Sequence, residues 1–371
     1  MDSQSPCSPH IPHLPDIVAQ MRQQARACAQ LGSPFYARLL ELVADDLGSG
    51  GPSVGVVHGY EDLPAQGAVP LRLLGAVHRL ALTGAAPHVA AHYPSCGGDG
   101  DPDAAWPAVR DVLAREAGVV NAFMASPPQT NEVGRAAALF GGLLAVLGRL
   151  GQVSESPMPV RLFEIGCSGG LNLLADHFTY RTMDGDTRGP LSSAVVLDPA
   201  WMTTPPGAPA AVDVVERVGA DLAPIDVTSQ DGAMRLLSYV WPDQLDRIER
   251  LQGAIEVARR NPVRLRRASA FELVEDVRLV DGAVTVLWHS VMWQYLDDVE
   301  KRSVLDQLSW LGEFADERKP LVHLAFEPSP TGKGPFLVTA TTWPGGGTST
   351  LGHAPPHGVP VAWADAAVGR D

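Results

Sequence analysis

The chain changes its sequence periodicity near residue 160, and this change constrains the fold most. From there onwards, short runs rich in β-forming residues alternate with helical stretches, the pattern of a parallel sheet with crossover helices. The predicted strands are residues 160–165, 214–220, 263–267, 284–288 and 321–326, with 336–343 and 359–363 as a final antiparallel pair. The predicted helices are residues 170–177, 232–260, 271–277 and 297–314. We therefore predict a Rossmann-like α/β domain of seven strands over residues 160–371.

One segment of this domain does not fit the alternation. Residues 178–213 make no simple crossover and are predicted to form an inserted hairpin, with 194–197 as one strand. The N-terminal part is different, because its apolar residues recur at helical spacing and residues 1–150 are predicted to be an all-helical domain. Ser33 and Pro34 begin one helix, and Gly84 ends another.

Two further helices are predicted in this N-terminal domain, at residues 106–124 and 132–150. The stretch 85–105 is rich in Gly, Pro and Asp and is predicted to be a loop. Residues 152–159 are predicted to link the two domains.

Composition excludes several classes of function. The net charge of −14 repels phosphate backbones and anionic lipid, so no nucleic-acid partner and no membrane partner are expected. No apolar run reaches the ~18 residues of a membrane span, and the N-terminus lacks a signal-peptide pattern. The four cysteines (Cys7, Cys28, Cys96 and Cys167) are widely spaced, which indicates neither disulfides nor a metal site and fits a cytoplasmic location.

A glycine-rich turn follows the first predicted strand and leads into a helix. Glycines let the backbone approach a ligand closely, and free amides at a helix start bind polar ligand groups. The acidic Glu164 at the strand end disfavours an anionic dinucleotide and favours a cationic ligand. The alternative is a turn that only packs helix on strand. The candidate cofactor-binding residues here are Glu164, Gly166, Cys167, Ser168, Gly169, Gly170 and Asn172.

This segment resembles motif I of class I S-adenosylmethionine-dependent methyltransferases, whose Glu/Asp-x-Gly-x-x-x-Gly loop contacts the amino-acid part of the cofactor. The resemblance implies a ribose-binding carboxylate after the second strand, here Asp221, with Asp198 and Asp226 as alternatives. It also implies an adenine contact at Ser269 and Ala270, although Ser replaces the common Asp.

Candidate catalytic residues follow the later strands. His289 ends the fourth strand and is suited to act as a base, because its ordinary pKa lies near working pH. Glu327 ends the fifth strand, and His357 or His353 near the last hairpin would line the same cleft. The alternative for each is a structural role.

A polar cluster precedes the most apolar helix. Gln129, Asn131, Glu132 and Arg135 are predicted to form a substrate-binding lip. The alternative is a helix-capping box with Thr130 or Asn131 as the cap.

Over nearly its whole length the chain resembles a bacterial family catalogued as domain of unknown function 2332. The resemblance rests on EIGCSGGLN, RVGADLAPIDV, HSVMWQYL and the TTWPGGG…PPHG hairpin. This second resemblance implies no activity. The functional expectation therefore rests on the resemblance to methyltransferases: an enzyme that takes S-adenosylmethionine as cofactor and a small molecule as substrate. The helical domain is expected to cap the cofactor cleft of the sheet. The alternatives are a non-catalytic sensor of S-adenosylmethionine or a nucleoside, and a Rossmann-type enzyme for another nucleotide.

Overall fold

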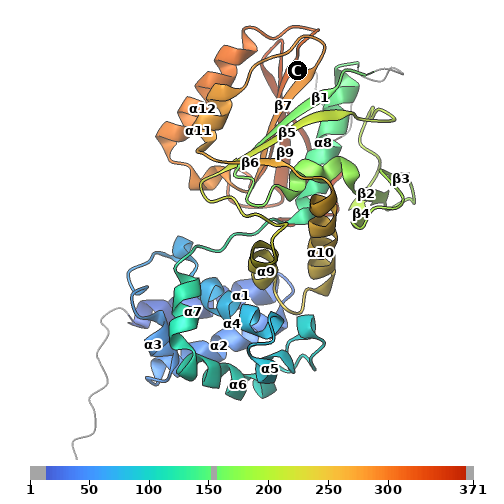
Figure 1. Cartoon of the computed structure of the whole chain (residues 1–371). Coiled ribbons are helices and arrows are strands. Elements are labelled where there is room, and N and C mark those ends of the chain that lie inside the picture. Colours follow the sequence, from blue (N-terminus) through green and yellow to red (C-terminus); the bar gives the residue numbers. More distant parts are fainter. Residues whose placement is uncertain (1–13, 152–156, 365–371) are drawn as a thin grey trace, which may run out of the picture. The chain divides into compact units, whose positions relative to one another are not determined.

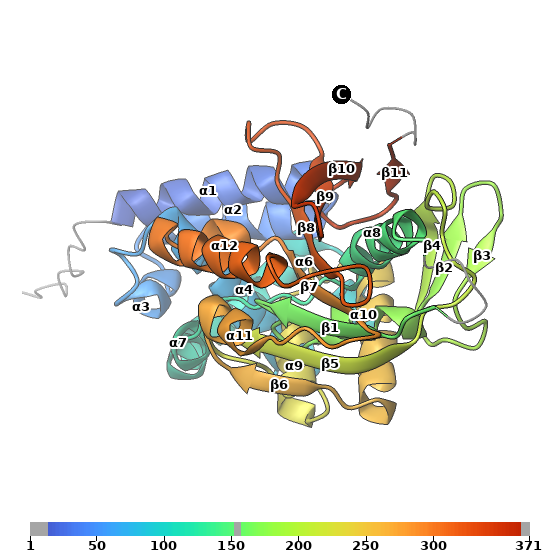
Figure 2. The same ribbon diagram turned by 90° about the horizontal axis from the view of Figure 1, so that it is seen from above.

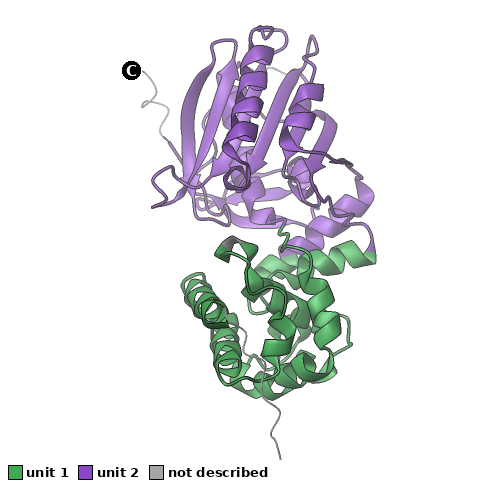
Figure 3. Ribbon diagram, turned by 90° about the vertical axis from the view of Figure 1, so that its left-hand side faces the viewer, with its two compact units in different colours: residues 1–130, 230–249 green, residues 131–229, 250–371 purple. Residues whose placement is uncertain are grey.

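The computed structural model describes residues 14–151 and 157–364. Two compact units make up the chain (Figure 3). The first runs to Thr130 and also includes Gln230–Glu249, and the second comprises Asn131–Ser229 and the chain from Arg250 onwards. The core of the predicted linker, residues 152–156, and Cys7 lie outside the described residues.

The first unit is helical, as predicted for the N-terminal region. Its longest helices enclose one apolar core that includes Met21, Leu40 and Val77 (Figure 1). Its helices are α1 (Leu14–Gln30), α2 (Pro34–Gly48), α3 (Ser53–Val57), η1 (Ala65–Gly67), α4 (Val69–Leu82), α5 (Pro87–Ala90), η2 (Pro94–Cys96), α6 (Pro102–Arg115), α7 (Ala117–Met124) and α9 (Gln230–Ser238).

Capping residues set several of these boundaries. Ser33 accepts a hydrogen bond from the Tyr36 backbone N–H before α2, and Gly84 with φ +76° follows α4, both as predicted. The predicted helix 106–124 is instead two helices that meet at Glu116. Its first part begins earlier, at Pro102, because Asp101 accepts from two backbone amides of the first turn.

A segment distant in sequence completes the first unit. The Trp241 side chain is buried in its core, and Asp243 accepts from Ser33 Oγ at 2.6 Å and Phe35 N at 3.0 Å. The predicted helix 232–260 is instead α9 followed by α10 (Leu245–Arg260). Pro242 explains the break, because its ring has no N–H and clashes with the preceding turn of a helix.

The second unit contains a mostly parallel sheet of eight strands, one more than predicted. The order is β11-β10-β9-β8-β7-β1-β5-β6, in which β6, β5, β1, β7 and β8 are parallel and the others antiparallel (Figure 2). The strands are β1 (Val160–Ile165), β5 (Val214–Asp221), β6 (Arg264–Arg267), β7 (Val284–Ser290), β8 (Leu321–Glu327), β9 (Phe336–Trp343), β10 (Gly347–Ala354) and β11 (Ala362–Trp363).

The final antiparallel pair differs from the prediction. The partner of β9 is β10, which was not predicted, and the run 359–363 contributes only the short β11 on the far side of β10. Gly345 and Gly346, with φ +114° and +68°, form the β9–β10 turn. β10 carries few apolar residues, which is why its sequence gives no strong strand signal.

Helices cover both faces of the sheet (Figures 1 and 2). The helices α11 (Ala270–Asp276) and α12 (Asp298–Gly312) pack with Phe163 and Leu287 on one face. On the other face lies α8 (Ala136–Arg149), preceded by η3 (Val133–Arg135). This helix was predicted within the helical domain 1–150, but its contacts with β8, β9 and β10 place it in the second unit.

The inserted segment forms a small sheet of its own. Its strands β2 (Thr179–Thr182), β3 (Thr187–Arg188) and β4 (Val196–Trp201) have the order β3-β2-β4. It follows η4 (Leu171–His177), the short helix after the glycine turn. Among the helices of the described residues, none combines the length and the apolar character needed to cross a membrane.

Gly141 and Gly142 let α8 lie flat on the sheet. A Cβ added at Gly141 would lie 2.3 Å from Trp363 Cζ2 and 2.8 Å from Trp201 Nε1, and one at Gly142 would lie 2.9 Å from Leu324 Cδ1. Trp201 cannot move aside freely, since its Nε1 donates to Ala137 O at 2.8 Å.

We expect Gly141→Ala to lower the free energy of unfolding of the second unit by about 1–3 kcal/mol, because the added methyl overpacks a buried contact. Hydrogen exchange at the peptides of α8 and β8 measures this. The control is Gly118→Ala in α7, where an added Cβ meets nothing within 4 Å and should be neutral or slightly stabilising. Unchanged exchange in Gly141→Ala would contradict the packing described for α8.

Candidate functional site

The candidate site lies at the carboxyl ends of β1 and β7. The chain leaves β1 towards β5 on one side, whereas β7 pairs with β1 on the other side. Such a reversal of strand order opens a crevice at the carboxyl ends of the strands, where open α/β sheets bind ligands.

The glycine loop, residues 166–170, crosses the end of β5. Gly166, Ser168 and Gly170 have φ values of +64°, +51° and +69°. A Cβ at Gly170 would also lie 2.7 Å from Leu265 Cδ2, so the leucine side chain would have to shift. Ser168 is not glycine, and such left-handed residues cluster at ligand-binding sites.

Asp221 holds this loop in place. Its Oδ2 accepts from Ser168 N at 2.9 Å and its Oδ1 from Ala223 N at 2.8 Å. The two alternatives lie elsewhere: Asp198 pairs with Arg181 in the small sheet, and Asp226 accepts from Thr228, whose hydrogen bonds lower the pKa of Asp226. Of the three carboxylates, Asp221 is the one that contacts the glycine loop.

Glu164 is a buried carboxyl at the end of β1. It is 2% exposed, and burial raises its pKa to about 8. The nearby Trp288 indole N–H and Asn172 side chain oppose this rise, and the charge of Asp221 adds to it. Because Trp288 pairs with Glu164 in the strand register, both side chains lie on the same face of the sheet.

One oxygen of this carboxyl and three other buried polar atoms of the site make no hydrogen bond of standard geometry to the described residues. Trp288 is near enough to lower the pKa of Glu164, although its Nε1 makes no hydrogen bond of standard geometry. Buried polar groups are normally paired, so such a group indicates a water, an ion or a ligand. The atoms are Glu164 Oε2, Ser168 Oγ, Asn172 Oδ1 and Trp288 Nε1.

A second cluster centres on His289. Its Nδ1 lies 2.7 Å from Glu327 Oε1, its Nε2 lies 3.0 Å from His323 Nε2, and its ring stacks on Trp293 at 4.9 Å. Burial and the neighbouring His289 lower the pKa of His323 to about 3, so His323 is neutral. Since successive side chains of a strand alternate between faces, His289 lies on the opposite face from Trp288.

Glu327 also shapes the loop after β7. Its Oε1 accepts from Met292 N at 3.0 Å and Trp293 N at 3.2 Å. The preceding Val291 has a left-handed φ of +53°, a strained conformation for a β-branched residue. The Met292 side chain reaches the glycine loop, because a Cβ at Gly166 would lie 2.9 Å from it. The loops after β1 and β7 are therefore in contact.

Other predicted cofactor residues have structural partners. Ser269 caps α11 in a capping box with Glu272, and the Ala270 N–H donates to Glu300. Cys167 is buried beside Gly219, and burial raises its thiol pKa well above the ordinary value.

The predicted substrate lip divides between the two units. Gln129 belongs to the first, whereas Asn131, Glu132 and Arg135 belong to the second. Asn131 Oδ1 accepts from Leu171 N at 2.9 Å, at the end of the glycine loop. The residue that caps η3 is Glu132, whose side chain accepts from the Gly134 N–H, and not Thr130 or Asn131 as the capping alternative predicted.

His357 lies against this lip segment. Its Nδ1 is 3.5 Å from Glu132 Oε2, and Arg135 Nε donates to Pro356 O at 3.3 Å. The fold therefore brings His289 together with Glu327, and His357 together with Glu132.

Sequence reasoning did not identify His323, Val291 or Met292 as site residues. Val291 and Met292 lie in the HSVMWQYL segment that was singled out, but no pattern reveals a left-handed φ. A signal for His323 existed, since a lone histidine within the apolar run of β8 is unusual.

Comparison with known proteins identifies one family. A family model described as "Uncharacterized protein conserved in bacteria (DUF2332)" matches residues 18–363. No curated protein and no solved structure matches the chain.

The raised pKa of Glu164 predicts a dependence of stability on pH. Between its ordinary value of 4.5 and about 8, the folded state retains a proton that the unfolded state releases. The contribution of this carboxyl to stability is therefore complete below pH 4.5 and is lost as pH rises towards 8.

We expect Glu164→Gln to remove this loss. The free energy of unfolding of the variant, relative to that of the wild type, should rise by a few kcal/mol at most from pH 5 to pH 8, since one pKa unit corresponds to about 1.4 kcal/mol. Urea unfolding at both pH values measures the difference. Glu317→Gln, at an exposed carboxyl, is the control. A difference between Glu164→Gln and wild type that is independent of pH would refute the assignment.

Proposed function

Because the chain belongs to the bacterial family DUF2332, whose description gives no activity, we propose a function from the site itself. We propose that the second unit binds S-adenosylmethionine and that the protein is a methyltransferase for a small-molecule substrate. The observation that carries the proposal is the buried Glu164 carboxyl beside the glycine loop, together with buried atoms of Ser168, Asn172 and Trp288 that make no hydrogen bond of standard geometry.

The residues fit the amino-acid part of this cofactor. A cationic ammonium group would favour the ionised form of Glu164 and satisfy its unpaired oxygen. The Ser168 hydroxyl and the Asn172 side chain offer further polar partners from the same loop and the helix after it. Gly166 and Gly170 keep this part of the backbone free of side chains.

Asp221 is suited to the ribose. Each of its oxygens accepts a backbone N–H, and a carboxylate oxygen can accept more than one hydrogen bond. The same carboxylate would therefore both fix the glycine loop and bind ribose hydroxyls. Ser269 and Ala270 instead serve to start α11, which leaves their predicted adenine contact without support from the Ser269 hydroxyl.

Catalysis would depend mainly on positioning. The bound cofactor supplies an electrophilic methyl group, and the transfer is an in-line displacement that proximity and orientation accelerate. His289 would hold or move a proton only through its contacts with Glu327 and His323.

One observation favours a second function, a non-catalytic sensor. Both ring nitrogens of His289 contact protein groups, and the side chain is 2% exposed, so it has no ring atom directed at solvent. A sensor would need the adenosyl site but no base.

The binding proposal predicts proton release. At pH 6.5 to 7, S-adenosylhomocysteine carries an ammonium group and should displace up to about one proton from Glu164, whereas adenosine should displace none. Calorimetry in buffers of different ionisation enthalpy measures this. Glu164→Gln should abolish the release and weaken binding about tenfold or more, or ~1.4 kcal/mol.

The control is Glu317→Gln, which should match the wild type in affinity and proton release. Absence of heat with both S-adenosylmethionine and S-adenosylhomocysteine, together with tight NAD binding, would overturn the proposal.

A separate experiment distinguishes enzyme from sensor. In an enzyme that uses His289 as a base, His289→Gln should lower turnover by ~10²- to 10⁴-fold and leave cofactor affinity within about threefold. The assay is transfer of labelled methyl from S-adenosylmethionine into a small-molecule extract of bacterial cells. Cofactor binding without any labelled product, and a His289→Gln variant that is only less stable, would favour the sensor.

A further inference from the structure

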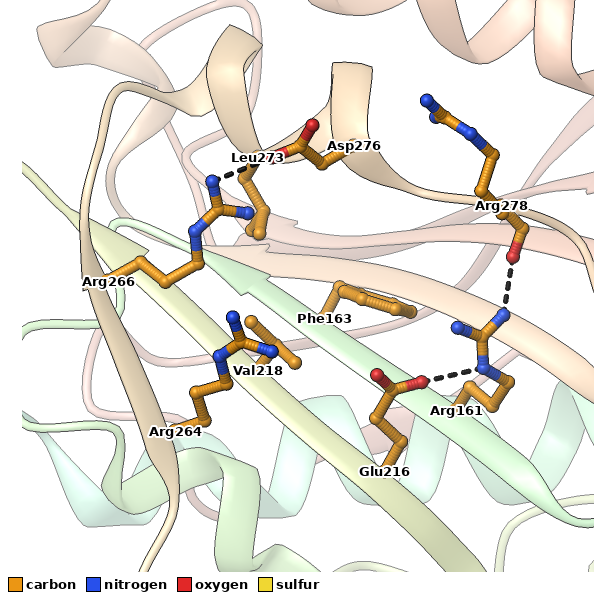
Figure 4. Close-up of a pocket in the computed structure, with 9 residues that line it drawn as sticks. All are labelled: Arg161, Phe163, Glu216, Val218, Arg264, Arg266, Leu273, Asp276 and Arg278. Atoms are coloured by element: carbon orange, nitrogen blue, oxygen red, sulfur yellow. Dashed lines mark hydrogen bonds and ion pairs between the residues drawn. The ribbon is translucent and has the colours of Figure 1, made fainter.

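A pocket in the second unit lies away from the glycine loop (Figure 4). Its volume is about 220 Å³, and it lies between the sheet and the end of α11. Four of its lining residues are arginines: Arg161, Arg264, Arg266 and Arg278. We call it the arginine pocket.

The strand register builds this pocket. Phe163 pairs with Val218, which pairs with Arg264, and Arg161 pairs with Glu216. Neighbours in register lie on one face, so these side chains share a patch of the sheet across β1, β5 and β6. Since Arg161 is the second residue of β1, the patch lies towards the amino end of that strand, whereas the glycine loop follows its carboxyl end.

The floor of the pocket is apolar. Phe163, Val218 and Leu273 line it and are each less than a tenth exposed. Figure 4 shows guanidinium groups of Arg161, Arg264 and Arg266 around the Phe163 ring. Arg161 Cζ lies 5.5 Å from the centre of this ring, a cation–π contact that helps to fix the guanidinium.

The arginines are held to different degrees. Arg161 pairs with Glu216 at 2.6 Å and Arg266 with Asp276 at 2.7 Å, so their guanidinium groups are oriented. Arg278 donates to backbone carbonyls of Glu275 and Val277. Arg264 is exposed, and within residues 14–151 and 157–364 its guanidinium group makes no hydrogen bond or ion pair.

Charge makes the pocket unusual for this protein. Four arginines and two acidic residues line it, an excess of two positive charges in a chain of net charge −14. Guanidinium groups bind carboxylates and phosphates with two parallel hydrogen bonds, and an apolar floor adds affinity for a flat hydrophobic group.

We propose that the arginine pocket binds a small organic anion, a carboxylate or phosphate attached to a planar apolar group. The anion would meet Arg264 and Arg266, and the apolar group would lie on Phe163. Arginines on an edge strand such as β6 also prevent pairing with another sheet, but this role does not explain Arg161 and Arg278, which lie outside β6.

Calorimetry on the full chain at low salt tests the proposal with three probes: phenyl phosphate, benzoate and phenol. At least one anion should bind saturably and more tightly than uncharged phenol. Added salt should weaken it, because the pocket is open to screening ions. Binding of one anion alone would identify its acidic group as the preferred one.

Arg264→Gln should lower the affinity of the pocket for the anion about tenfold. This substitution removes no hydrogen bond or ion pair of the described residues, so the variant should remain folded. Arg302→Gln, at an exposed arginine of α12 outside the pocket, should stay within about twofold of the wild type. S-adenosylhomocysteine should not displace the anion, which separates this test from that of the proposed function.

Two outcomes would overturn the proposal. In one, neither anion binds more tightly than phenol. In the other, Arg264→Gln and Arg302→Gln weaken binding equally, so that attraction to positive charge in general explains the affinity.

Discussion

The hydrogen bond from the Ser168 N–H to Asp221 connects the end of β5 to the loop after β1. A loop with left-handed residues has few conformations that it can adopt cheaply, and this bond selects one of them. The approach of Met292 to Gly166 and the start of η4 both depend on that loop conformation. The side chain of Asp221 therefore has a structural role in fixing this loop.

Much of the fold follows from sequence because its signals are local. The run 160–165 coincides with β1, and Ser33 with Pro34 begins α2, since β-branched periodicity and helix caps act within a few residues. The errors arise where context decides. β10 is too polar to be recognised without its partner β9. The sequence of α8 is that of any buried helix, and it does not show that α8 packs against the sheet.

The candidate site was predictable to a similar extent. The acidic strand end and the glycine turn are contiguous in sequence, so Glu164 and Gly166 could be named directly. The environment of His289 could not, because His323 lies 34 residues away and reaches it only through the register of β7 and β8. The raised pKa of Glu164 likewise comes from burial beneath residues that no linear pattern brings together.

The division of the chain has a consequence for biosynthesis. The first unit needs residues 230–249, because Trp241 fills its core and Asp243 binds the start of α2. A ribosome releases the chain from its N-terminus, and domains made of contiguous sequence can fold as they emerge. Here the helices of the first 130 residues must wait, with an incomplete core, until β1 to β5 of the other unit have been synthesised. The N-terminal helices thus emerge first but acquire their last core residues only after most of the chain has been made.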